Sequence, residues 1–154
     1  MGASRTSTKH QRIELPNVEA TAALARRLAD DAARGDVIGL SGPLGAGKTT
    51  FARAFIGEIA RLSGETVDEV PSPTFTLVQT YSFARATVWH FDLYRIGKPA
   101  EAWEIGLEAA LAEGILLIEW PERLGPLLPA KRIDVALAHG ATPDARIAEI
   151  STHG

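Results

Sequence analysis

The sequence contains no cysteine, which excludes a disulfide framework, a thiolate metal site and a cysteine nucleophile. Its histidines are few and scattered, without the spacing of zinc ligands: His10, His90, His139 and His153. A metal site built mainly from histidine and cysteine is therefore not expected.

Long apolar runs are also absent. The longest unbroken aliphatic run covers residues 115–118, far short of the roughly 20 apolar residues that a membrane-spanning helix needs. The first ten residues are polar and contain no hydrophobic segment typical of a secretory signal. We therefore expect a cytoplasmic protein with no membrane contact.

The sequence also has no excess of positive charge. The net charge is −3, the pI is near 5.8, and no stretch gathers lysine and arginine on one face. Proteins that bind the phosphodiester backbone of nucleic acid usually carry a patch of lysine and arginine on one face. Direct binding of nucleic acid is therefore disfavoured.

The composition is that of a globular protein, with 154 residues, of which 45% are hydrophobic and 23% charged. This length suits one domain with a core of its own. Residues 1–10 are small and polar, and we predict a disordered N-terminal tail there. Residues 11–154 are predicted to form a single domain.

Strand and helix patterns alternate along the chain. A short edge strand at Ile13 and Leu15 precedes a helix capped by Asn17 and ending near Arg34. The further predictions are strands at 37–40, 115–119, 133–138 and 146–150, helices at 48–62 and 99–112, and a hairpin of 74–81 with 87–91. Gly106 interrupts the second of these helices. The alternation predicts an α/β fold with a mainly parallel sheet, helices on both faces and an added antiparallel hairpin.

A phosphate-binding loop follows the strand at 37–40. The segment matches the P-loop (Walker A) pattern G-x-x-x-x-G-K-[ST] in its strand-to-helix context, through Gly42, Pro43, Leu44, Gly45, Ala46, Gly47, Lys48 and Thr49. Glycine allows successive backbone N–H groups to point inward at phosphate oxygens. Lys48 is expected to reach the β and γ phosphates of the nucleotide, and the Thr49 hydroxyl to bind Mg²⁺. The alternative is a glycine-rich turn that matches by chance, and the flanking elements disfavour it.

Hydrolysis also needs a second anchor for the metal and a group that orients water. Glu119 ends the apolar strand at 115–119, where a second metal-binding acid of P-loop proteins is found. The alternative is a solvated acid at a strand end. Asp92 shares a strand face with Val88 and His90. The polar residues on this face fit the wall of a binding site as well as an ordinary exposed strand face.

Four further side chains have weaker claims to a functional role. His90 is more typical of a structural histidine, and Arg95 could pair with an acid. Trp120 could be core, lid or contact surface, whereas the helical spacing of Trp103 predicts a core position.

Four segments together resemble the TsaE family, ATPases of bacterial tRNA threonylcarbamoyladenosine biosynthesis. They are residues 42–50, ending in Thr50; residues 72–78 followed by Tyr81; residues 90–95; and residues 118–122. Their order and spacing are similar to those of the family, and the resemblance covers roughly residues 14–129.

The resemblance implies an ATPase that works with the proteins TsaB and TsaD on the adenosine beside the tRNA anticodon, and that meets tRNA only through these partners. It implies ATP and Mg²⁺ as cofactors, Thr49 and Glu119 as metal ligands, and Asp92 as an essential acid near the γ-phosphate. Residues 72–76 look like a switch loop, and Thr21 matches a family threonine near the nucleotide base, although capping or packing would also explain it. Pro43 departs from the family, which usually has an acid there, and residues 104–108 shorten its acidic segment.

Two rival functions remain open. Many P-loop domains of this length are small-molecule kinases, but such enzymes usually carry an arginine-bearing lid, and only Arg123, Lys131 and Arg132 occupy that region. The other rival is a nucleotide-gated interaction module that binds ATP and hydrolyses little. A GTPase is disfavoured, because no lysine stands in an Asn-Lys-x-Asp or Thr-Lys-x-Asp stretch.

Overall fold

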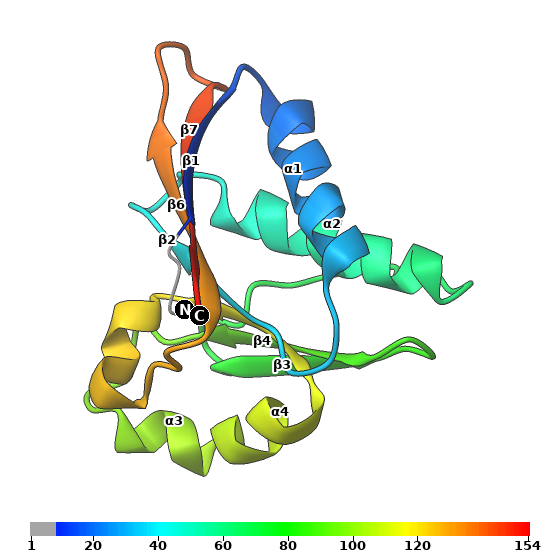
Figure 1. Cartoon of the computed structure of the whole chain (residues 1–154), viewed down its shortest axis with the longest axis vertical. Coiled ribbons are helices and arrows are strands. Elements are labelled where there is room, and N and C mark those ends of the chain that lie inside the picture. Colours follow the sequence, from blue (N-terminus) through cyan, green and yellow to red (C-terminus); the bar gives the residue numbers. More distant parts are fainter. Residues whose placement is uncertain (1–8) are drawn as a thin grey trace, which may run out of the picture.

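The computed structural model describes residues 9–154, which form a sheet of seven strands with helices on both sides (Figure 1). The strands are β1 (Lys9–Leu15), β2 (Val37–Ser41), β3 (Val78–Ser82), β4 (Thr87–Asp92), β5 (Ile115–Glu119), β6 (Arg132–His139) and β7 (Arg146–His153). The helices are α1 (Val18–Asp31), α2 (Lys48–Leu62), α3 (Ala100–Glu104), α4 (Leu107–Glu113) and the 3-10 helix η1 (Pro121–Leu127).

The strand order is β1-β7-β6-β2-β5-β4-β3. β6, β2, β5 and β4 run parallel to one another, whereas β1 and β7 at one edge and β3 at the other pair antiparallel with their neighbours. This arrangement confirms the predicted mainly parallel sheet and the added hairpin, which is β3 with β4.

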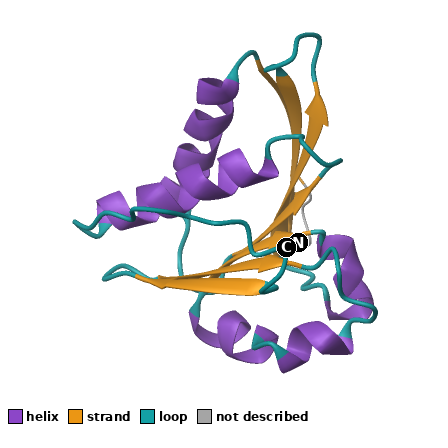
Figure 2. Cartoon of the chain, turned by 180° about the vertical axis from the view of Figure 1, so that it is seen from behind, coloured by secondary structure: helices purple, strands orange, loops and turns teal. Residues whose placement is uncertain are grey.

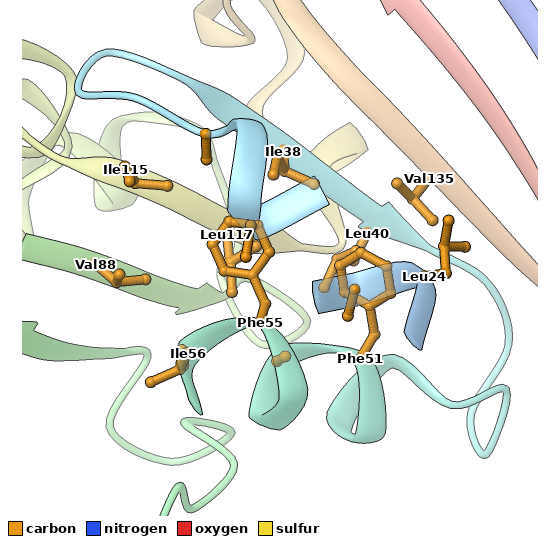
Figure 3. Packing of buried hydrophobic residues seen from close by; sticks show 14 of the residues in the cluster. Leu24, Ile38, Leu40, Phe51, Phe55, Ile56, Val88, Ile115, Leu117 and Val135 are labelled. Carbon is orange, nitrogen blue, oxygen red and sulfur yellow. The ribbon is translucent and has the colours of Figure 1, made fainter. Parts of the chain in front are cut away.

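Helices cover both faces of the sheet (Figure 2). Alternate residues of β5 divide between two cores: Ile115 and Leu117 pack with α1 and α2, while Leu116 and Ile118 pack with α3, α4 and η1. The rings of Phe51 and Phe55 stack at 6.4 Å beneath β2 and β5 (Figure 3). Because both faces of β5 are buried, its residues 115–118 are all apolar and do not alternate with polar ones.

The start of α1 agrees with its prediction, because the Asn17 carboxamide oxygen accepts a hydrogen bond from the N–H of Ala20 at 2.8 Å. The helix ends at Asp31, before the predicted end at Arg34. The carboxylate of Asp36 accepts from the N–H of Ala33 at 2.8 Å, so this turn replaces the last helical residues.

Three other predictions need correction. The predicted tail at 1–10 extends too far, because Lys9 and His10 pair with β7; residues 1–8 lie outside the described residues. β3 begins at Val78, not at residue 74, because Leu77 adopts a φ of 70° and its N–H donates to the carbonyl of Pro73 in a turn. Trp103 is 44% exposed, so its predicted core position is wrong.

The helical segment predicted at 99–112 divides at Gly106, as its glycine suggested. Gly106 has a φ of 108°, a conformation that disfavours other residues, and separates α3 from α4. Within residues 9–154, the helices lack the length and apolar character needed to cross a bilayer.

Candidate functional site

The predicted site residues gather where the parallel strands end. Glu119 at the end of β5 is in register with Leu40 of β2 and with Asp92 of β4, so both acids lie beside the loop that follows β2. A cavity of about 300 Å³ opens there. It is lined by Leu44, Gly45, Gly47, Lys48, Thr49, Thr50, Ser72, Thr74, Asp92, Glu119, Trp120 and Arg146.

The phosphate loop takes a conformation that depends on glycine. Gly42 has a φ of 138°, and a Cβ there would collide with the carbonyl oxygen of Leu137 on β6. Gly47, with a φ of 98°, stands immediately before the first residue of α2. The loop therefore reaches the N-terminus of a 15-residue helix, whose free N–H groups and positive dipole end favour an anion.

Lys48 is 5% exposed and points back into its own loop. Its Nζ donates to the carbonyl oxygen of Gly42 at 2.7 Å and lies 3.9 Å from the ring centroid of Trp120. Burial lowers the pKa of Lys48 below its ordinary value, and the carboxylates of Glu119 and Asp92 oppose that fall. The amino group of Lys48 therefore lies in the cavity next to two acids.

Glu119 is not a solvated acid at a strand end, since it is only 4% exposed. Its Oε2 accepts a hydrogen bond from the Nε2 of His90, 2.7 Å away on the neighbouring strand β4. His90 is 1% exposed, so the pair is shielded from water. The histidine fixes the orientation of the glutamate carboxylate toward the cavity, a structural role that the sequence pattern already favoured.

Asp92 is 4% exposed, which excludes the alternative of an ordinary exposed strand face. Its two carboxylate oxygens accept from the hydroxyl of Thr74 and from the N–H of Tyr94, both at 3.0 Å. The Thr74 hydroxyl is also 2.8 Å from that of Ser72. Asp92 therefore ties the segment predicted as a switch loop to the cavity.

Other predicted residues lie outside the lining. Gly42, Pro43 and Ala46 shape the loop without reaching the cavity wall. Thr21 of α1 is buried behind the loop, and its methyl carbon is 3.8 Å from the position that a Cβ on Gly47 would take.

Trp120 lines the cavity, and both Trp120 and Arg95 contact aromatic rings. Besides contacting Lys48, Trp120 packs on Tyr94, with ring centroids 4.9 Å apart. Arg95 lies 5.2 Å from the ring of Phe75, an aromatic contact in place of the acid that was considered.

Sequence reasoning missed Arg146, the first residue of β7. One of its guanidinium nitrogens donates to the carbonyl oxygen of Gly45 at 3.1 Å, across 101 positions in the chain. Because Arg146 begins a strand after a turn, local pattern carried no signal of this contact. Only the pairing of β6 with β7 brings it to the phosphate loop.

The donor set around the cavity fits Mg²⁺. Among residues 9–154 there is no cluster of three or more His, Asp or Glu side chains arranged to hold a metal by themselves. Mg²⁺ commonly uses one or two protein oxygens together with phosphate oxygens and water, and Thr49 and Glu119 line the same cavity. The site therefore suits a metal that arrives with a nucleotide.

Comparison with known proteins identifies the family. A family model described as threonylcarbamoyl adenosine biosynthesis protein TsaE matches residues 15–147. A Rickettsia felis protein named tRNA threonylcarbamoyladenosine biosynthesis protein TsaE is 43% identical over 123 residues, covering 80% of this chain and 70% of that protein. A Bacillus subtilis protein of the same name is 34% identical over 135 residues, covering 85% and 79%.

A solved structure has the same architecture. The crystal structure of YdiB from Bacillus subtilis superposes with a TM-score of 0.77 at 30% identity, covering 96% of this chain and 88% of that chain. The fold, the phosphate loop with its neighbouring acids, and the match over residues 15–147 agree. The chain belongs to the TsaE family.

Proposed function

We propose that the protein binds and hydrolyses ATP with Mg²⁺, and that this nucleotide cycle supports a complex of TsaB and TsaD in the threonylcarbamoylation of the adenosine beside the tRNA anticodon. Contact with tRNA would pass through these partners, in agreement with the net charge of −3. Because tRNA is a cytoplasmic substrate, the proposed role also places the protein in the cytoplasm.

One observation carries the proposal. Lys48, Thr49, Asp92 and Glu119 come from three separate segments of the chain, yet all line one cavity at the carboxyl ends of parallel strands. Ligands of open α/β sheets bind at this edge. A basic residue, a hydroxyl and two carboxylates beside a glycine-rich loop at a helix N-terminus are the groups that phosphoryl transfer to water requires.

Each residue has a proposed task. The loop amides and Lys48 hold the phosphates, which requires Lys48 to exchange its contact with the Gly42 carbonyl for phosphate oxygens. Thr49 and Glu119 are the proposed ligands of Mg²⁺, which when bound neutralises charge on the terminal phosphate. Asp92 lies on the other side of Glu119 from the loop and is proposed to orient the attacking water.

The first experiment measures phosphate release by the purified protein, alone and with TsaB and TsaD added, beside a Lys48→Ala control. Strong stimulation that the control lacks is expected. ATP binding without stimulation by either partner would contradict the proposed cycle and favour the interaction module or a kinase.

A second experiment separates turnover from binding. Asp92→Asn and Glu119→Gln keep side-chain shape and are expected to reduce turnover by roughly 10²-fold or more, as for other residues that stabilise a transition state, while ATP affinity changes much less. Equal losses of binding and turnover would support the module. Screening for phosphorylated small alcohols would reveal a kinase.

A further inference from the structure

Two residues other than glycine have a positive φ within residues 9–154, and both border the acids of the site. Trp120, with a φ of 59°, directly follows Glu119. Leu77, with a φ of 70°, has a carbonyl oxygen that accepts from the N–H of Asp92 at 2.9 Å. Side chains other than hydrogen disfavour this backbone conformation, and strain of this kind gathers at functional sites. Leu77 lies outside the cavity lining, so its effect on the site has to pass through its neighbours.

Leu77 closes a single turn of helix-like backbone. Its N–H donates to the carbonyl oxygen of Pro73, four residues earlier, at 2.7 Å. This bond and the positive φ are those of a helix C-terminus, where the residue in the left-handed region is usually glycine. For leucine the left-handed region is disfavoured by roughly 5–30-fold relative to the right-handed one. The turn therefore ends on a residue that its own backbone conformation disfavours.

The strained turn holds Asp92 from two directions. The carbonyl oxygen of Leu77 accepts from the backbone N–H of Asp92, and the Thr74 hydroxyl, inside the turn, donates to the Asp92 carboxylate at 3.0 Å. A change of φ at Leu77 would rotate residues 73–76 relative to β3 and carry Thr74 away from the carboxylate. The conformation of Leu77 thus decides whether the Asp92 side chain keeps its hydroxyl partner.

Packing of the leucine side chain opposes the strain in its backbone. The side chain is half-buried and packs against the core on the α3 and α4 side of the sheet, which includes Phe91 and Leu93. Phe75, at the centre of the turn, is 83% exposed and does not anchor it in that core. Packing at Leu77 favours the turn and its positive φ disfavours it, so one residue carries both effects.

We propose that Leu77 is a positioning residue for Asp92, which holds the contact between Thr74 and Asp92 through a strained turn that opens reversibly. When the turn opens, Asp92 stays in β4 but loses the hydroxyl that orients its carboxylate, so the attacking water is less well placed. The inference rests on the proposed hydrolysis of ATP. It adds a residue that controls turnover from outside the cavity and leaves the contacts of the phosphates unchanged.

Two truncations separate the backbone of Leu77 from its side chain. Leu77→Ala and Leu77→Gly both remove the packing, but only alanine keeps the cost of a positive φ. In chymotrypsin digestion of the nucleotide-free protein, cleavage after the exposed Phe75 reports how often the turn is open. We expect this cleavage to be about fivefold faster or more in Leu77→Ala than in Leu77→Gly. Cleavage after Tyr94, which is 43% exposed and lies outside the turn, is the internal control and should be equal in both.

ATP turnover by the same two variants tests the link to Asp92. We expect kcat to be about fivefold lower or more in Leu77→Ala than in Leu77→Gly, in proportion to the open turn. The KM for ATP should agree within about twofold, because Leu77 does not line the cavity and a loss confined to kcat marks an interaction made in the transition state.

Equal impairment of the two variants in both assays would overturn the inference, because packing alone would then explain the leucine. Two variants that both match the unmodified protein would overturn it as well. A difference in cleavage after Phe75 without a difference in kcat would overturn the inference and leave the proposed ATPase intact. Failure of the unmodified protein to hydrolyse ATP, alone and with its partners, would refute the proposed function and the inference with it.

Discussion

The buried pair of His90 and Glu119 offers the sharpest test of how the site is held together. The His90 Nε2 is 2.7 Å from the Glu119 Oε2, and the two residues are 1% and 4% exposed. In His90→Gln the amide nitrogen reaches about as far as Nε2 and can still donate to the carboxylate. In His90→Asn the amide nitrogen stops near the position of Nδ1 and cannot, so the two variants separate the hydrogen bond from mere polarity.

The expected loss of stability follows from the burial of this hydrogen bond. Removal of one partner from a buried, charge-assisted hydrogen bond costs about 1–3 kcal/mol. In a domain of this size 1 kcal/mol corresponds to a melting-temperature change of about 2–4 °C, so a loss of ~2 kcal/mol in His90→Asn would lower the melting temperature by about 4–8 °C. A metal ligand that loses its orienting partner typically loses roughly 10–100-fold in metal affinity or activity.

Thermal unfolding and phosphate release over a Mg²⁺ titration would measure both effects. We expect His90→Asn to unfold earlier and to need more Mg²⁺, and His90→Gln to lie close to the unmodified protein. An asparagine variant with unchanged melting temperature and Mg²⁺ dependence would refute the reasoning. If both variants were equally impaired, packing of the imidazole ring would matter more than its hydrogen bond.

Three further predictions concern the phosphate loop, the segment predicted as a switch loop, and an ion pair on α2. Gly42→Ala should weaken ATP binding at least about tenfold in calorimetry, because a positive φ and the neighbouring β6 carbonyl leave no room for a Cβ; normal affinity would contradict the loop geometry. Thr74→Val removes the hydroxyl that donates to Asp92 and should slow ATP turnover about tenfold with affinity unchanged; an equal loss of affinity would indicate a role in binding. The hydrogen bond from Arg61 holds the pKa of Glu58 down, from 4.5 to about 2. A depressed carboxylate pKa stabilises the fold above the unfolded value and ceases to do so as the pH falls through the folded value. Glu58→Gln should therefore lower the free energy of unfolding by about 1 kcal/mol at neutral pH, and its deficit in urea unfolding should shrink between pH 4.5 and about 2; a deficit independent of pH would exclude this ion pair as its cause.

Much of the fold was predictable because its signals are local. The phosphate loop carries its glycines, lysine and threonine in eight consecutive residues, and the apolar strand at 115–119 needed only its composition. The cap at Asn17 was visible for the same reason, since its partner Ala20 is three residues away. Such contacts depend on short sequence separation, so pattern alone identifies them.

Other features depend on tertiary contacts. Trp103 has helical spacing but lies on the exposed side of the five-residue helix α3. The strand at 74–81 was predicted too long because its β-branched and aromatic residues outweighed the turn that Leu77 makes in the left-handed region. His90 appeared unremarkable until the register of β4 with β5 placed it against Glu119.

The pairing of β1 with β7 has a consequence for how the chain folds during synthesis. Among residues 9–154, β1 has no other neighbour in the sheet, and its register joins Lys9 to Thr152 and Leu15 to Arg146. Chains emerge from the ribosome N-terminus first, so β1 is made early and must wait for β7 before its backbone groups find partners. Such long-range pairing slows folding and leaves an open strand edge that invites association with other chains. Arg146 belongs to β7, which is synthesised late, so it joins the lining of the cavity only after β7 has been made and paired.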